Sequence, residues 1–86
     1  MKNIAILGST GSIGESTLSV IRNFPDRFRV VALSVNSDIN KLLKQIKEFK
    51  PLSVCVNDKS RLPALSKNIS PKIKVFAGPD GLKALV

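Results

Sequence analysis

Residues 4 to 15 read Ile-Ala-Ile-Leu-Gly-Ser-Thr-Gly-Ser-Ile-Gly-Glu, and this stretch decides the fold. A short apolar run leads into glycines at Gly8, Gly11 and Gly14, and a helical pattern follows. This order predicts a strand, a phosphate-binding turn and a helix. The first N–H groups of a helix have no partners inside it, and the helix dipole adds positive charge there, so this end forms an anion site.

Each glycine has its own expected role in such a turn. Gly8 would adopt the backbone angles of the reversal, which a Cβ atom penalises. Gly11 would let the backbone approach a ligand diphosphate, and Gly14 would let the helix sit close against the strand. Ser12 and Glu15 have the spacing of a capping box, so we expect the helix to begin there. An ordinary tight turn without a ligand is the alternative interpretation.

Strands and helices alternate through the rest of the chain. The expected elements are a helix over 12–23, a strand over 28–35, a helix capped by Ser37 or Asp38, a strand over 52–56, a helix over 60–67, a strand over 72–77, and a turn at 78–81 into a last helix. Apolar stripes are expected on the first helix at Ile13, Thr17, Val20, Ile21 and Phe24, and on the second at Ile39, Leu42, Leu43, Ile46 and Phe49. The apolar strand over 28–35 is expected to be covered on both faces.

Successive strand-helix units predict a parallel sheet with right-handed crossovers. The expected fold class is α/β, a partial Rossmann-type parallel sheet of about four strands with helices on both faces. We interpret residues 1–86 as the N-terminal part of a dinucleotide-binding domain.

Composition limits the possible functions. The 86 residues suffice for one small core, and no apolar run approaches the roughly 20 residues of a membrane span, so we expect no membrane partner. A single cysteine, Cys55, and the absence of room for a leader before the first strand make the cytoplasm the expected location. Cys55 is flanked by valines and is expected to be a buried apolar side chain.

The net charge of +8 suggests an anionic partner: a nucleotide, a phosphorylated substrate or nucleic acid. Evenly spaced lysines on the second helix are typical of a solvated surface, and the chain has neither Trp nor Tyr for base stacking, so nucleic acid is not the expected partner. The chain has no histidine, and its six acidic residues are dispersed. We therefore expect neither catalytic nor metal-binding residues in it, and interpret Ser9, Thr10 and Ser12 as phosphate donors.

In this fold the tip of the second strand selects the dinucleotide, because an acid there binds the ribose 2′-hydroxyl and repels a 2′-phosphate. The absence of an acid at Ser34 and Val35 favours NADP over NAD. Asp38 lies close by, however, and residues 34–40 contain no Arg or Lys. A 2′-phosphate would therefore depend on hydroxyl, amide and backbone donors. Asp38 itself is either a helix cap or a ligand residue.

The longer sequence pattern is similar to one enzyme family. The matching segments are Leu7-Gly8-Ser9-Thr10-Gly11-Ser12-Ile13-Gly14, Ser16-Thr17-Leu18, Val20-Ile21-Arg22, Pro25-Asp26-Arg27-Phe28 and Val30-Val31-Ala32-Leu33, followed by Gln45, Phe49, Pro51 and Gly81-Leu82. They resemble the N-terminus of 1-deoxy-D-xylulose 5-phosphate reductoisomerases. The resemblance covers essentially all of the chain but only about a fifth of a typical member of the family.

This resemblance implies an NADPH-dependent enzyme of isoprenoid precursor biosynthesis, usually a homodimer, that uses Mg²⁺ or Mn²⁺. It would isomerise and reduce 1-deoxy-D-xylulose 5-phosphate, a phosphorylated sugar, to 2-C-methyl-D-erythritol 4-phosphate by the non-mevalonate route. The family's metal-binding acids and substrate loop have no counterpart here, so the catalytic and C-terminal domains are expected beyond Val86.

The resemblance also implies site residues. Positions matching Thr10, Gly11, Ser12 and Ile13 hold the cofactor phosphates, and those matching Asn36, Ser37 and Asp38 surround the adenosine ribose and its 2′-phosphate. A common family pattern at the latter is Gly, then Lys or Arg, then Asn, and this sequence lacks that cation.

Two other interpretations stay open on the sequence. One is the cofactor-binding half of another NAD(P)-dependent reductase or dehydrogenase. The other is a non-catalytic basic module that binds anions or nucleic acid.

Overall fold

Four parallel strands form one sheet in the order β1-β2-β3-β4. The computed structural model describes the backbone of residues 1–85 and the side chains of residues 1–81. The strands are β1 (Lys2–Leu7), β2 (Phe28–Val35), β3 (Ser53–Val56) and β4 (Lys74–Ala77). The helices are α1 (Ser12–Asn23), α2 (Ile39–Phe49), α3 (Leu62–Lys67), which follows the 3₁₀ turn η1 (Lys59–Arg61), and α4 (Gly78–Leu85).

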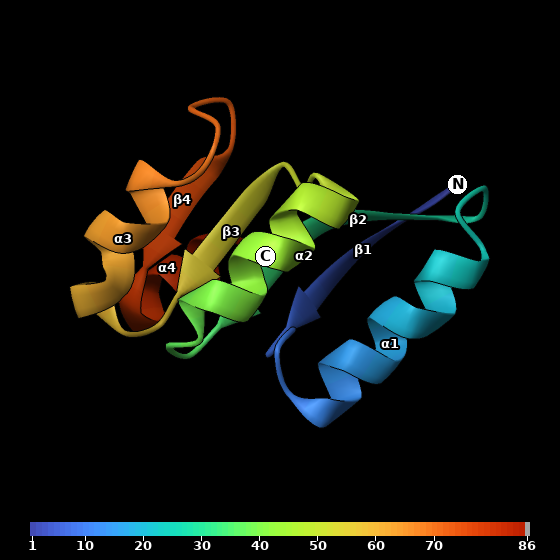
Figure 1. Ribbon diagram of the computed structural model, residues 1–86, viewed down its shortest axis with the longest axis horizontal. Coiled ribbons are helices and arrows are strands. Elements are labelled where there is room, and N and C mark those ends of the chain that lie inside the picture. Colours follow the sequence, from blue (N-terminus) through green and yellow to red (C-terminus); the bar gives the residue numbers. More distant parts are fainter. Residues whose placement is uncertain (86) are drawn as a thin grey trace.

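Helices cover both faces of the sheet, as expected for the α/β fold class (Figure 1). Each right-handed crossover from β1 to β4 moves the chain one strand in the same direction, which puts α1, α2 and α3 on one face. Buried side chains of these helices, such as Leu18, Leu42 and Leu65, share one core with the sheet. On the other face α4 packs tightly against the sheet. A Cβ atom on Gly81 would lie only 3.2 Å from Cys55 Sγ of β3.

A β-bulge in β2 lets this strand serve both faces. Relative to β1, β2 carries one extra residue, Val31. An extra residue reverses the alternation of side chains, so Val30 before the bulge and Leu33 and Val35 after it all join the core under α1 to α3. Ser34, which points the other way, is 6% exposed. The prediction that β2 is covered on both faces is confirmed for its second half.

The bounds of α1 are as predicted, but of its predicted apolar stripe only Ile21 is confirmed as a core residue. The buried face consists of Gly14, Leu18 and Ile21, which follow one another at four- and three-residue intervals. Three apolar residues of the predicted stripe lie on faces that solvent reaches: Ile13 (85% exposed), Val20 (54%) and Phe24 (45%). The stripe predicted for α2 is confirmed, since its members are buried or packed against the core.

Other boundaries shift in the second half of the chain. β3 and β4 begin one and two residues later than predicted, and η1 precedes α3. The predicted turn at 78–81 is wrong, because α4 starts directly at Gly78. Gly78 makes the reversal alone with φ +75°, and Pro79 then occupies the first helical turn, where its missing N–H costs nothing. Val86, which the sequence placed in this helix, lies outside the described residues.

Cys55 is 1% exposed, as predicted for a buried apolar side chain. Burial raises the pKa of its thiol above the ordinary value, which opposes formation of a reactive thiolate. In residues 1–85 no helix combines the length and the apolar character that crossing a membrane requires.

Candidate functional site

The turn between β1 and α1 has the predicted backbone geometry. Gly8 has φ +69°, in the left-handed region that favours glycine. The Gly11 amide donates a hydrogen bond of 3.1 Å to the Gly8 carbonyl and closes the turn, and α1 begins at the next residue. Gly8 is thus confirmed as the residue that makes the reversal.

The predicted capping box at Ser12 and Glu15 is wrong. Gly11 is the N-cap, with extended backbone, and no side chain caps the helix. Ser12 is therefore already inside the helix, one position too late to cap it. The Glu15 carboxylate instead lies 3.4 Å from the Lys41 ammonium on α2. The Ser12 hydroxyl is left available at the mouth of the turn.

Some amides of the turn are bonded inside the protein and others are not. Gly8 N donates to Ser34 Oγ (3.2 Å), and Ser9 N donates to the Ser34 carbonyl (2.8 Å). The amides of Thr10, Ser12 and Ile13 have no hydrogen-bond partner among the described residues. They lie at the positive end of α1, and Ser12 and Ile13 are exposed. The turn thus presents a set of open N–H groups suited to an anion.

Gly11 and Gly14 face different surroundings. A Cβ atom on Gly14 would lie 2.3 Å from the Gly8 carbonyl oxygen and 2.7 Å from Ser9 Cα, so only glycine lets α1 approach the turn this closely. A Cβ on Gly11 would have no neighbour nearer than the Gly8 oxygen at 3.5 Å. The rest of the space around such a Cβ is open. The role predicted for Gly14 in close packing is confirmed.

Two polar side chains that the sequence analysis did not connect with the glycine turn hold it in place. Ser34, on the neighbouring strand, accepts the Gly8 amide. Gln45, on α2, donates through Nε2 to the Ser9 carbonyl at 2.8 Å and is 8% exposed. The sequence signal for Gln45 was a polar residue at a position that the apolar pattern of α2 places on the buried face. The Gln45 Oε1 atom and the Ser9 hydroxyl are both buried and have no hydrogen-bond partner among the described residues.

We expect Gln45→Met to destabilise the protein by about 1–3 kcal/mol, because it leaves the buried Ser9 carbonyl without a donor while keeping a similar volume. The unfolding free energy from urea denaturation checks this. As a control, Lys44→Met changes an exposed residue of the same helix and should alter stability by less than about 0.5 kcal/mol. Equal effects of the two changes would contradict the role given to Gln45.

The second group of predicted site residues, Asn36, Ser37 and Asp38, lies where β2 ends, close to the glycine turn. A cavity of about 270 Å³ is bordered by both Gly8 and Asn36. Its lining residues are Leu7, Gly8, Ser34, Val35, Asn36, Cys55 and Asn57. The Asn36 side chain accepts a hydrogen bond from Asn57 Nδ2 (3.1 Å), and its carbonyl accepts one from the Asp58 amide (2.9 Å). The carboxyl ends of β1, β2 and β3 thus meet at one edge, where this class of fold binds dinucleotides.

Asp38 is the N-cap of α2, which confirms one of the two interpretations left open for it. Its carboxylate accepts a hydrogen bond of 3.2 Å from the Lys41 amide. Ser37 precedes it and is half-buried. A ligand at this loop would therefore meet a carboxylate that is already engaged with the helix.

We expect Asp38→Ala to lower the unfolding free energy by about 1 kcal/mol, because it removes this cap. Asp38→Asn keeps a hydrogen-bond acceptor and should change the unfolding free energy by only about 0.3 kcal/mol. Thermal unfolding of the two variants separates the cap from a role of the charge. If Asp38→Asn proved as destabilising as Asp38→Ala, the negative charge and not the hydrogen bond would be the stabilising feature.

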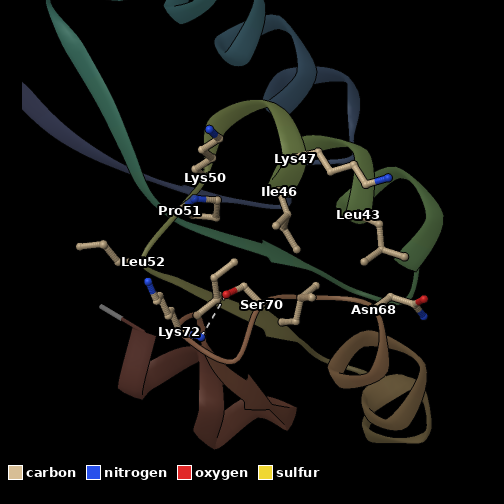
Figure 2. A pocket seen from close by; sticks show the side chains of 11 residues that line it. Leu43, Ile46, Lys47, Lys50, Pro51, Leu52, Asn68, Ser70 and Lys72 are labelled. Carbon is tan, nitrogen blue, oxygen red and sulfur yellow. Dashed lines mark hydrogen bonds between the residues drawn. The ribbon is translucent and has the colours of Figure 1, made fainter.

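A larger cavity, of about 540 Å³, is not part of this site (Figure 2). It lies between the end of α2 and the segment 68–73, at the amino ends of β3 and β4. Its lining is mostly apolar, with Lys47, Lys50 and Lys72 at the border. The glycine turn lies at the opposite edge of the sheet. Among the described residues no group of His, Cys, Asp or Glu is arranged to hold a metal ion.

Comparison with known proteins identifies the family. Residues 4–86 match the family model described as 1-deoxy-D-xylulose 5-phosphate reductoisomerase. The chain belongs to this family. The reductoisomerase of Caldanaerobacter subterraneus subsp. tengcongensis is 44% identical over 86 residues, which are 100% of this chain and 22% of the relative. That of Chlamydia caviae is 48% identical over 85 residues, covering 98% of this chain and 22% of the relative.

Solved reductoisomerases share the fold. A crystal structure of DOX-P reductoisomerase in complex with NADPH, fosmidomycin and magnesium superposes with a TM-score of 0.92 at 36% identity, over 99% of this chain and 21% of that one. The Zymomonas mobilis reductoisomerase in complex with NADPH gives a TM-score of 0.91 at 30% identity, over 98% of this chain and 22% of that one. The chain thus spans about a fifth of the length of the reductoisomerases it matches. The family assignment decides against the cofactor-binding half of another reductase.

Proposed function

We propose that this chain is the NADPH-binding segment of a 1-deoxy-D-xylulose 5-phosphate reductoisomerase, with the turn at 8–14 holding the diphosphate. The observation that carries the proposal is that the amides of Thr10, Ser12 and Ile13, next to Gly11, have no hydrogen-bond partner in the described part of the chain. Similar reductoisomerases have been solved with NADPH bound, which supports it.

The residues present fit a dinucleotide. The amides of the turn and the N-terminus of α1 supply hydrogen bonds and positive potential for the diphosphate. Close packing at Gly14 and the hydrogen bonds of Ser34 and Gln45 fix the shape of the turn, which favours binding with little rearrangement. In the loop after β2, Asn36 lines the cavity next to Gly8, and Ser37 lines the cavity beside the start of α2. NADPH, when bound, supplies the hydride, and the residues of this chain bind and orient it.

The remaining functions of such an enzyme are assigned to residues outside these 86. We propose that they include the catalytic and C-terminal domains, the Mg²⁺ or Mn²⁺ ligands and the site for the phosphorylated sugar. The magnesium and fosmidomycin bound in a solved reductoisomerase support the last two. A homodimer and a cytoplasmic location are proposed from the family resemblance and the single cysteine, and the resulting enzyme would serve isoprenoid precursor biosynthesis.

Titration of the full-length protein with NADPH and NADH tests the proposal. We expect saturable NADPH binding that adenosine 2′,5′-bisphosphate displaces, because this competitor carries the 2′-phosphate of NADPH. A protein that ignored both nucleotides and instead bound duplex DNA with a steep salt dependence would contradict the proposal and favour the basic binding module.

A further inference from the structure

The 2′-phosphate of NADPH carries a negative charge that NADH lacks, and proteins usually meet it with an Arg or a Lys. Residues 34–40, from the end of β2 to the start of α2, contain neither. If the proposed NADPH function is correct, a cation that another segment of the fold brings close to this loop would be a suitable partner for the 2′-phosphate. The following inference rests on that proposed function.

The structure brings Arg61 to the loop. A cavity of about 300 Å³ lies beside the start of α2, and Arg61 lines it together with Ser37 and Asp38. Arg61 belongs to η1, which follows β3 and is separated from the loop by more than twenty residues of sequence. The hydrogen bonds from Asn57 and Asp58 to Asn36 join the two loops, so η1 is held next to the loop.

Arg61 forms only a long, exposed ion pair with Asp58. Arg61 Nε lies 3.9 Å from Asp58 Oδ2, and the two side chains are 58% and 41% exposed. Ion pairs this exposed contribute little to stability. The Asp58 carboxylate also accepts hydrogen bonds from the amide (3.0 Å) and the hydroxyl (2.6 Å) of Ser60, so it stays satisfied when the guanidinium turns away. Arg61 can then turn toward a phosphate at Ser37 with two parallel N–H groups.

Lys59, the other cation of η1, points elsewhere. A Cβ atom placed on Gly78 would lie 2.4 Å from Lys59 Cε, so the Lys59 side chain lies against the junction of β4 and α4. It does not line the cavity beside Ser37. Two negative charges do border this region, Asp38 and Asp58, and both are engaged in caps at the starts of α2 and η1. Arg61 is thus the cation of η1 placed to offset them.

We propose that Arg61 is the residue that selects NADPH over NADH, by binding the 2′-phosphate in place of the cation that the loop at 36–38 lacks. In this arrangement the loop after β2 supplies the Ser37 hydroxyl and backbone donors, and the loop after β3 supplies the charge.

Calorimetric titration of the full-length protein with NADPH and NADH, for the wild type, Arg61→Ala and Lys59→Ala, tests this. Arg61→Ala should weaken NADPH binding about tenfold or more and change NADH binding less than about twofold. Lys59→Ala removes the same charge from the same 3₁₀ turn and should change either affinity less than about twofold. Arg61→Lys should recover part of the NADPH affinity.

The possible failures are distinguishable. If Arg61→Ala weakened both nucleotides equally, or if Lys59→Ala reduced NADPH affinity as much as Arg61→Ala, general charge would explain the result and the inference would be wrong. Equal affinity of the wild type for NADPH and NADH would also overturn it, although the proposed dinucleotide function would survive. A wild type that bound neither would instead refute the proposed function.

Discussion

Replacing Gly14 with alanine is expected to lower the unfolding free energy by about 2 kcal/mol, although alanine is the better helix former. The added Cβ would lie 2.3 Å from the Gly8 carbonyl oxygen and 2.7 Å from Ser9 Cα, and both are backbone atoms that other bonds hold in place. The helix or the turn must therefore move. Urea denaturation of the full-length protein measures the effect.

Ser19→Ala is a matched control for this experiment. Ser19 lies on an exposed position of the same helix, where alanine should stabilise slightly or leave stability unchanged. The sign of the Gly14 result is decisive. A stabilisation of about 1 kcal/mol by Gly14→Ala, the value that helix propensity alone predicts, would show that α1 does not depend on close approach to the turn.

The second large effect is expected for Gly11→Ala, on binding and not on stability. Its Cβ would meet no protein atom nearer than 3.5 Å, and its φ of −78° suits any residue, so the unfolding free energy should change by less than about 0.5 kcal/mol. The Cβ would project into the space proposed for the diphosphate, and NADPH affinity should fall about 30-fold, equivalent to about 2 kcal/mol.

Calorimetry with NADPH, paired with thermal unfolding of the same sample, measures both effects of Gly11→Ala. NADH affinity should fall by a similar factor, because both nucleotides carry the same diphosphate. Unchanged affinity for both nucleotides in a stable variant would place the diphosphate elsewhere.

The sequence was sufficient for features that depend on local chemistry. The strand before Gly8, the helix over 12–23 and the apolar stripe of α2 follow from hydrophobic periodicity and glycine conformation, which act within a few residues. The edge at which the ligand would bind follows from parallel topology alone. Of the predicted site residues, Gly8 in the turn after β1 and Asn36 in the loop after β2 border one cavity, whereas Ser37 and Asp38 border another.

What could not be predicted depends on contacts between distant segments. The stripe of α1 was misjudged because apolar Ile13 and Val20 look like core residues, although the sheet contacts a neighbouring face of the helix. The bulge at Val31 changes which side chains of β2 face the core, and nothing in the run of apolar residues announces it. Gln45 reaches a carbonyl 36 positions away, and Arg61 reaches a loop that only the fold brings near.

A crystal structure of the full-length protein with NADPH tests the central claim most directly. We predict diphosphate oxygens within about 3.2 Å of the backbone nitrogens of Thr10, Ser12 and Ile13, the amides that have no partner among the described residues. A diphosphate bound elsewhere, with these nitrogens bonded to protein atoms, would contradict the account.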